Sequence, residues 1–334
     1  MSQFAEAYRA TLDIYVRSGR EDQLEAAYAL GREAFAGGMT LLELIDLHRM
    51  AVDAVLAQRA QPPGADVVTA TFEFLAEALT TFEMTQRGYW EAQHRARLER
   101  EQSLMLQNNL LPRAVPSFPG LDVAVRYLPG EAASHAGGDW YDLFELEDGR
   151  AGLVVGDVSG HGVTAAAAMG QLRIAVLAYA LAGFEPASVL QRVDMLVDRL
   201  NTGDEIATML YIIVDPPSRE LVVANAGHPP PIVIEPDRTS RLLVGGHTLL
   251  LGLSGGRQPR NHHSEQLKPG SQLLLYTDGL AEPLERAGGD GFAQLLKATD
   301  GFSGSAQDLC DHVLAQLTPR RSGDDICILV AGLE

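Results

Sequence analysis

The feature that most constrains the fold of this chain is a set of acidic residues at the ends of apolar segments. The apolar run "GLVV" leads directly into a Gly-Asp pair, a second Gly-Asp pair lies one predicted hairpin earlier, and "QLLLYTDG" and "SGDDICILV" show the same arrangement. A buried carboxylate without a partner is costly, so four such positions predict strands that converge on a cation. The acidic residues are Asp139, Asp157, Asp278 and the adjacent pair Asp324 and Asp325.

The chemistry of these side chains restricts the cation. Carboxylates without accompanying histidine or cysteine ligands favour hard divalent ions such as Mg²⁺ and Mn²⁺ over a structural zinc. Two such ions about 4 Å apart share a bridging carboxylate and activate water for attack on phosphorus. A single Asp-Gly is usually only a turn, but four acidic positions on apolar strand ends are not explained in that way. The adjacent glycines are expected to let the backbone turn sharply.

The second part of the chain alternates strand-like and helix-like patterns. Short apolar runs occur in hairpin order, as in "ATMLYIIVDPPSRELVVANAG", and helical patterns interrupt them. This order predicts antiparallel sheets packed against helices, an α+β fold. The predicted strands are 121–127, 151–157, 208–214, 221–225, 231–234, 272–277 and 326–331, and the predicted helices are 163–182, 186–201 and 305–317.

The first part of the chain is helical by pattern. Residues 1–90 contain three or four amphipathic segments separated by Gly/Pro turns, which predicts a small helical bundle. Thr40 is expected to cap one helix with Glu43 as its capping-box partner. Residues 91–112 are predicted to form a charged linker helix that ends at Pro112, and residues 113–334 are predicted to form the α+β domain. The linker is either a solvated spacer or a coiled-coil seam with a second copy.

Charge and cysteine content limit the partners and the compartment. The net charge of −18 argues against nucleic acid and against an anionic membrane as partners. The two cysteines imply no disulfide framework, and the charged N-terminal segment does not resemble a signal peptide. The longest apolar stretch, near residues 164–183, contains Gln171 and Arg173, which predicts a buried helix rather than a membrane span. We therefore expect a cytoplasmic protein.

Five ordered motifs resemble a known enzyme family. "GGDWYD", "GDVSGHG", "NAGHPPP", "YTDGLAE" and "GDDICILV" are similar to the motifs of SpoIIE/RsbU-type metal-dependent protein phosphatases, bacterial relatives of the type 2C serine/threonine phosphatases. The resemblance covers residues 105–332 and implies an α-β-β-α sandwich with two Mn²⁺ or Mg²⁺ ions between its sheets. Trp140, Ala281 and Cys327 depart from the common pattern without touching a ligand position. No phosphate-binding arginine is found near the first strand, and Arg126 is not assigned that role.

The resemblance also implies roles for individual residues. Asp157 corresponds to the bridging ligand, and Asp139 and the main-chain carbonyl of Val158 to ligands of one ion. Asp278 and Asp324 correspond to ligands of the other ion. Asp325 is expected to support the ligands, although the sequence leaves open which of the two adjacent acids binds. Asn225 and His228 of "NAGHPPP" are expected near the cleft without an assigned chemical role.

The N-terminal region resembles the RsbU N-terminal domain. This resemblance implies a dimerising helical bundle that receives an activating partner of the RsbT switch-kinase kind. The implied substrate is a phosphorylated STAS-type anti-sigma factor antagonist in a partner-switching stress or sigma-factor pathway. Two alternatives remain open from the sequence: a degenerate phosphatase that only binds its partner, and a hydrolase of small phosphate esters.

Overall fold

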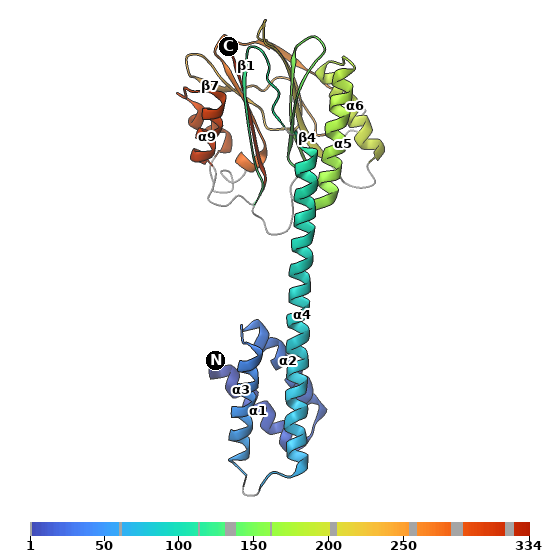
Figure 1. Ribbon diagram of the computed structural model, residues 1–334, viewed down its shortest axis with the longest axis vertical. Helices are drawn as coiled ribbons and strands as arrows, with labels where there is room; N and C mark the ends of the chain where they lie inside the picture. Colours follow the sequence, from blue (N-terminus) through green and yellow to red (C-terminus); the bar gives the residue numbers. More distant parts are fainter. Residues whose placement is uncertain are drawn as a thin grey trace. The chain divides into compact units, whose positions relative to one another are not determined.

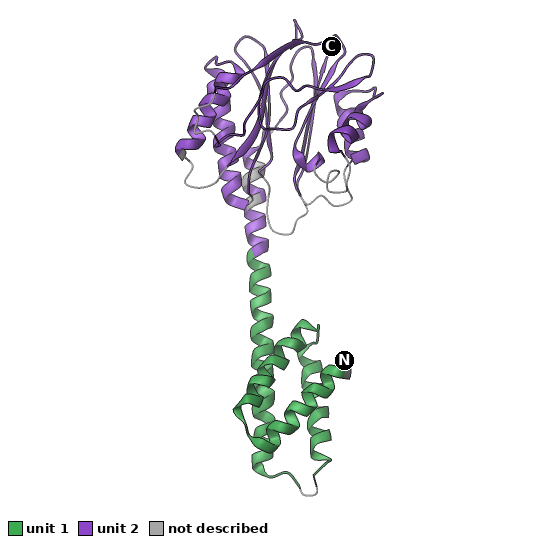
Figure 2. Ribbon diagram, turned by 180° about the vertical axis from the view of Figure 1, so that it is seen from behind, with its two compact units in different colours: residues 1–95 green, residues 96–334 purple. Residues whose placement is uncertain are grey.

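The chain divides into two compact units, residues 1–95 and 96–334 (Figure 2). The first unit is helical and the second contains two sheets with helices, as the sequence predicts. A computed structural model describes residues 2–59, 62–112, 114–130, 138–160, 162–200, 206–253, 259–281, 290–317 and 324–334.

The first unit is built from amphipathic helices around an aromatic core. Its helices are α1 (Ser2–Ser18), α2 (Glu21–Ala36), α3 (Leu41–Leu56) and the first part of α4 (Ala65–Leu110) (Figure 1). The capping box at α3 forms as predicted: Thr40 Oγ1 accepts the Glu43 N–H, and the Glu43 carboxylate accepts the Thr40 N–H at 2.7 Å. Core side chains include Tyr8, Leu12, Leu44, Phe74 and Phe82.

Helix α4 is longer than the sequence pattern indicated. Residues 91–110 continue without a break from the preceding helical segment, and the boundary between the two units falls within this helix. The first half of this stretch is highly charged, and no glycine or proline follows Gly88 until Pro112 ends the helical pattern. The helical conformation therefore continues through the region expected to connect the domains.

The second unit contains two mainly antiparallel sheets. One has the strand order β1-β11-β10-β6-β7, and the other has the order β2-β3-β4-β5-β8 with β9 also pairing with β5. The strands are β1 (Leu121–Leu128), β2 (Trp140–Glu145), β3 (Ala151–Val158), β4 (Ala207–Asp215), β5 (Glu220–Ala226), β6 (Ile232–Ile234), β7 (Ser240–Leu242), β8 (His247–Thr248), β9 (His263–Gln266), β10 (Gln272–Tyr276) and β11 (Ile326–Leu333).

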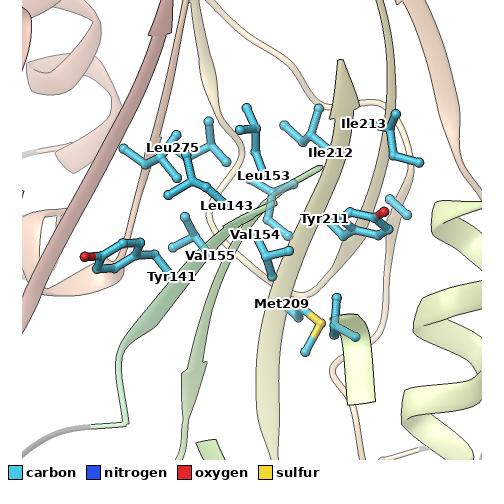
Figure 3. Close-up of a cluster of buried hydrophobic side chains, with 14 of the residues drawn as sticks. Tyr141, Leu143, Leu153, Val154, Val155, Met209, Tyr211, Ile212, Ile213 and Leu275 are labelled. Carbon is cyan, nitrogen blue, oxygen red and sulfur yellow. The ribbon is translucent and has the colours of Figure 1, made fainter. Parts of the chain in front are cut away.

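The sheets pack face to face and helices cover their outer faces. Helices α5 (Gly162–Leu181) and α6 (Pro186–Leu200) contact the six-stranded sheet, whereas α8 (Gly291–Thr299) and α9 (Ala306–Leu317) contact the five-stranded sheet (Figure 1). Figure 3 shows Leu143, Leu153 and Ile212 of one sheet in the same buried cluster as Leu275 of the other. This arrangement is the predicted α-β-β-α sandwich.

Helix α5 is the apolar segment that the sequence predicts to be buried. Among the described residues it is the one helix long and apolar enough to cross a membrane by length and composition. Its side chains Ala166, Met169 and Val176 are instead fully buried, and the helix packs against β2 and β3. The apolar character of α5 is therefore used in the core of the second unit.

Candidate metal centre

The acidic residues of the motifs lie where the two sheets meet. Asp139 precedes β2 and Asp157 lies near the end of β3, in the six-stranded sheet, while Asp278 follows β10 in the five-stranded sheet. Carboxylate oxygens of these three residues lie within 4.8 Å of one another. Antiparallel pairing places the end of β3 beside the start of β2, which brings Asp157 close to Asp139.

Burial and mutual repulsion make this cluster costly without a cation. Burial, followed by repulsion from Asp157, raises the pKa of Asp139 well above its usual range. Burial, followed by repulsion from Asp278 and Asp324, raises the pKa of Asp157 to about 7. The Thr277 hydroxyl hydrogen-bonds to the Asp139 carboxylate, but buried Asp139 Oδ2 has no hydrogen-bond partner among the described residues. This oxygen-only donor set fits a hard divalent cation.

The two adjacent acids before β11 have different surroundings. The Asp325 carboxylate is 1% exposed and accepts hydrogen bonds from the Tyr127 hydroxyl and from the Gly130 N–H, the latter at 2.7 Å. Asp324 is exposed, its Oδ1 accepts the Asp325 N–H at 2.9 Å, and its charge acts on Asp157. Asp325 thus ties the end of β1 to β11, whereas the Asp324 charge acts on the cluster.

Two glycines beside the acids are required for close approach of the backbone rather than for sharp turning. A Cβ atom on Gly138 would lie 2.0 Å from the Val158 carbonyl oxygen, and one on Gly279 would lie 1.9 Å from the Asp325 carbonyl oxygen. Neither glycine has a positive φ, so the close approach, and not a left-handed backbone conformation, requires glycine at these positions. The close approach at Gly138 also brings the Val158 carbonyl beside the segment that carries Asp139.

The "NAGHPPP" motif forms a closed turn after β5. The Asn225 side chain accepts the His228 N–H at 2.8 Å and donates to the His228 carbonyl at 2.9 Å. The His228 ring contacts Thr208 Oγ1 and the Tyr276 carbonyl oxygen, at 2.8 and 3.1 Å. Burial lowers the pKa of His228 to about 3, so its ring is neutral near pH 7. Both ring nitrogens have partners within the protein.

Three residues around the acids were missed by reasoning from the sequence: Tyr127, Thr208 and Thr277. Thr277 directly precedes Asp278 in "YTDG", and among these three residues only this position beside a candidate ligand could have indicated a role at the site. Arg126, beside Tyr127, pairs with Asp311 of α9 at 2.9 Å on the other face of β1. The alternation of side chains along a strand therefore directs Tyr127 towards the acids and Arg126 away from them.

An ion pair connects helix α5 to strand β2 near the acids. Arg173 Nε lies 2.9 Å from the Asp142 carboxylate, and Arg173 Nη1 donates to the Leu110 carbonyl of α4, also at 2.9 Å. The Leu110 side chain packs so closely on Gly170 that a Cβ there would lie 2.9 Å from it. Asp142 follows Asp139 by three residues, so these contacts connect the last turn of α4 with the strand beside the acid cluster.

Two family models match the chain. Residues 147–334, more than half of the chain, match the model described as stage II sporulation protein E (SpoIIE). Residues 6–85 match the model described as phosphoserine phosphatase RsbU, N-terminal domain.

Curated relatives agree with this assignment. Phosphoserine phosphatase RsbU of Bacillus subtilis is 23% identical over 283 residues, which cover 83% of this chain and 81% of RsbU. Phosphoserine phosphatase RsbP of the same organism is 26% identical over 211 residues, which cover 61% of this chain and 51% of RsbP.

Solved structures show the same fold. The structure of the RsbU and RsbW domains of Rv1364c from Mycobacterium tuberculosis is 34% identical with a TM-score of 0.58, covering 67% of this chain and 63% of that one. A structure of the PP2C phosphatase domain of SpoIIE from Bacillus subtilis, at 17% identity and a TM-score of 0.53, covers 64% of this chain and 63% of that one and shares the fold. With the acid cluster at the meeting point of two sheets, these matches show that the chain belongs to the SpoIIE family of PP2C-type protein serine/threonine phosphatases and carries an RsbU-like N-terminal domain.

Proposed function

We propose that this phosphatase removes the phosphoryl group from a phosphorylated serine or threonine of a STAS-type anti-sigma factor antagonist, using two Mn²⁺ or Mg²⁺ ions. The observation that carries the proposal is the convergence of Asp139, Asp157 and Asp278 from two sheets within 4.8 Å. The names of RsbU and RsbP as phosphoserine phosphatases support the substrate class. A solved structure of RsbX in complex with magnesium, 21% identical with a TM-score of 0.52, shares the fold.

The ligand roles are those that the resemblance to the phosphatase family implies, and the convergence of Asp139, Asp157 and Asp278 supports them. Asp157, which interacts with acids from both sheets, is the candidate for the bridging carboxylate. Asp139 and the Val158 carbonyl are assigned to one ion, and Asp278 and Asp324 to the other. Asp325 supports the set by holding β1 against β11, because Tyr127 and Gly130 occupy its carboxylate.

The bound ions would supply Lewis acidity and a water of lowered pKa. The chain itself supplies fixed anionic ligands: Thr277 orients the Asp139 carboxylate, and strand pairing fixes Asp157 relative to β2 and β4. The intact acids argue against a degenerate binding module, which would not need to keep such a costly cluster.

A direct assay separates the three functions. Release of phosphate is measured from a phosphorylated STAS protein and from a small aromatic phosphate, with Mn²⁺ and with a chelator. We expect metal-dependent release from the protein substrate and its loss in Asp278→Asn, while Asp198→Asn, an exposed change on α6, retains activity. Release from the small ester alone would favour the small-ester hydrolase, and binding of the phosphoprotein without release would favour the binding module.

The same proposal includes activation through the N-terminal domain. The match of residues 6–85 to the RsbU N-terminal domain supports an activator of the switch-kinase kind. Contacts of Arg173 with Leu110 and Asp142 provide a physical route from the end of α4 to β2. We expect an activator to lower the Mn²⁺ concentration needed for turnover, and Arg173→Gln to reduce that response. An unchanged response in Arg173→Gln would contradict this route.

A homodimer through residues 1–112 completes the proposal. The first unit exposes Leu42, Ile45 and Phe72, and a groove of about 440 Å³ between α3 and α4 is lined mainly by apolar side chains including Ile45, Val68 and Phe72. Burial of such side chains favours association. Light scattering of the full chain is expected to give a dimer that Phe72→Ser weakens; a monomer at micromolar concentration would contradict this part of the proposal.

A further inference from the structure

The ring of His228 lies between the two sheets. Nδ1 is 2.8 Å from Thr208 Oγ1 of β4, which belongs to the six-stranded sheet. Nε2 is 3.1 Å from the carbonyl oxygen of Tyr276, the last residue of β10 in the five-stranded sheet. The His228 side chain therefore connects the two layers of the sandwich.

The chemistry of the two partners fixes the tautomer of the ring. A carbonyl oxygen only accepts hydrogen bonds, so Nε2 carries the proton that is donated to Tyr276. In a neutral imidazole the other nitrogen is then an acceptor, and the Thr208 hydroxyl donates to Nδ1. The ring is 1% exposed, which favours the neutral form.

Each hydrogen-bond partner of His228 is a neighbour of an acid of the candidate centre, Thr208 by strand pairing and Tyr276 by its position in the sequence. Thr208 is the direct register partner of Asp157 in the β3–β4 ladder. Tyr276 precedes Asp278 by two residues, and Thr277 between them hydrogen-bonds to Asp139. His228 thus connects β4, which pairs with the strand that carries Asp157, to the end of β10, which Asp278 follows.

The turn that carries His228 is itself held in place. Asn225 closes the turn through two hydrogen bonds to the His228 backbone, and its own N–H donates to the Gly246 carbonyl at 2.9 Å. The Thr248 hydroxyl donates to the Asn225 carbonyl at 2.7 Å. Because these hydrogen bonds hold the turn in place, the His228 ring keeps Thr208 Oγ1 and the Tyr276 carbonyl oxygen at a fixed separation.

We propose that His228 is a positioning residue for the metal centre, because its ring sets the separation of Asp157 and Asp278 across the sandwich. This inference rests on the proposed function, in which these acids bind the ions. His228 is not itself a ligand, since both its nitrogens bond to the protein. Loss of a group that orients metal ligands typically weakens metal binding about 10- to 100-fold.

The test measures Mn²⁺ binding by calorimetry on the full chain, without any turnover. Thr208→Val removes the hydroxyl that donates to His228 and nearly preserves volume, and we expect the Kd for Mn²⁺ to rise about tenfold. Thr208→Ser keeps the hydroxyl and is expected to bind Mn²⁺ as the unmodified chain does. Thr208→Cys, with its weaker donor, is expected to be intermediate.

Thr299→Val is the matched control. Thr299 is also fully buried, but its hydroxyl bonds to carbonyls of its own helix, Leu295 and Leu296, both at 3.1 Å. It is expected to lower the melting temperature, as Thr208→Val does, without changing the Kd for Mn²⁺. Nitrogen chemical shifts of the His228 ring in the unmodified chain report its tautomer and are expected to show a proton on Nε2.

The outcomes distinguish failure of the positioning role of His228 from failure of the proposed metal centre. Equal Kd values for Thr208→Val, Thr299→Val and the unmodified chain would overturn the positioning role while leaving the metal centre intact. A proton on Nδ1 alone would also overturn it. Absence of Mn²⁺ binding in the unmodified chain would overturn the proposed function and this inference with it.

Discussion

Replacing Asp157 by asparagine is predicted to have opposite effects on stability with and without metal. In the metal-free protein, burial and neighbouring acids raise the Asp157 pKa from 3.8 to about 7. The folded state then holds this proton more tightly than the unfolded state does. Stability therefore falls as pH rises from about 4 to about 7, and the whole penalty is present above that range.

The size of the effect follows from the pKa shift. A difference of roughly three pKa units corresponds to about 4 kcal/mol at most, because each unit is worth about 1.36 kcal/mol. The asparagine amide still needs hydrogen-bond partners in a partly buried position, which offsets part of the gain. We therefore expect metal-free Asp157→Asn to be about 1–3 kcal/mol more stable than the unmodified chain near pH 8.

Denaturation by urea, followed with a chelator and with excess Mn²⁺, provides the assay. With chelator the variant is expected to be the more stable protein near pH 8, and this advantage should be lost as the pH falls to about 4, where only the cost of burying the amide remains. With Mn²⁺ the unmodified chain gains stability by binding, and the order should reverse. Asp198→Asn, which removes an exposed carboxylate from α6, controls for the change in net charge and is expected to shift stability by less than about 0.5 kcal/mol.

Two results would refute this reasoning. If metal-free Asp157→Asn is less stable than the unmodified chain at high pH, the acids do not repel one another as the geometry indicates. If Mn²⁺ stabilises the variant as much as the unmodified chain, Asp157 does not hold the ion.

Other substitutions test a buried ion pair of the second unit and the close backbone approach beside the centre. Arg260→Ala should destabilise the second unit by about 3–5 kcal/mol, measured by urea denaturation, because the Arg260–Asp194 ion pair is buried, with the two side chains 1% and 0% exposed; a loss below about 1 kcal/mol would contradict this. Gly279→Ala should abolish metal-dependent phosphatase activity, because its Cβ would lie 1.9 Å from the Asp325 carbonyl oxygen. Gly88→Ala, on α4 with open space around the added Cβ, should leave activity unchanged; equal activities in the two variants would show that the close approach at Gly279 is unimportant.

The sequence predicted the structure best where a hydrophobic pattern is compatible with only one kind of element. Strands β3, β4 and β11 are fully or nearly fully buried along their lengths, so each reads as an uninterrupted apolar run with predictable ends. Strands β7, β8 and β9 are short and lie at or beside a sheet edge, and their partly exposed residues carry no such pattern. Helix α8, with nine residues, was likewise missed.

The candidate site shows the same division. The acids were predictable because burying a carboxylate at the end of an apolar strand costs free energy unless a cation or another partner compensates its charge. The different surroundings of Asp324 and Asp325 were not, because adjacent residues point to opposite sides of an extended chain and only the fold shows which side faces Tyr127. The contacts of His228 with Thr208 and Tyr276 depend on the order of strands in two sheets, which local sequence does not encode.

The central claim is that the acids from the two sheets hold divalent ions. Anomalous scattering from crystals of the full chain grown with Mn²⁺ tests it most directly. We predict anomalous density bounded by the carboxylates of Asp139, Asp157 and Asp278, with Asp157 contacting both ions. Density elsewhere, or none at these carboxylates in crystals of protein that binds Mn²⁺ in solution, would contradict the account.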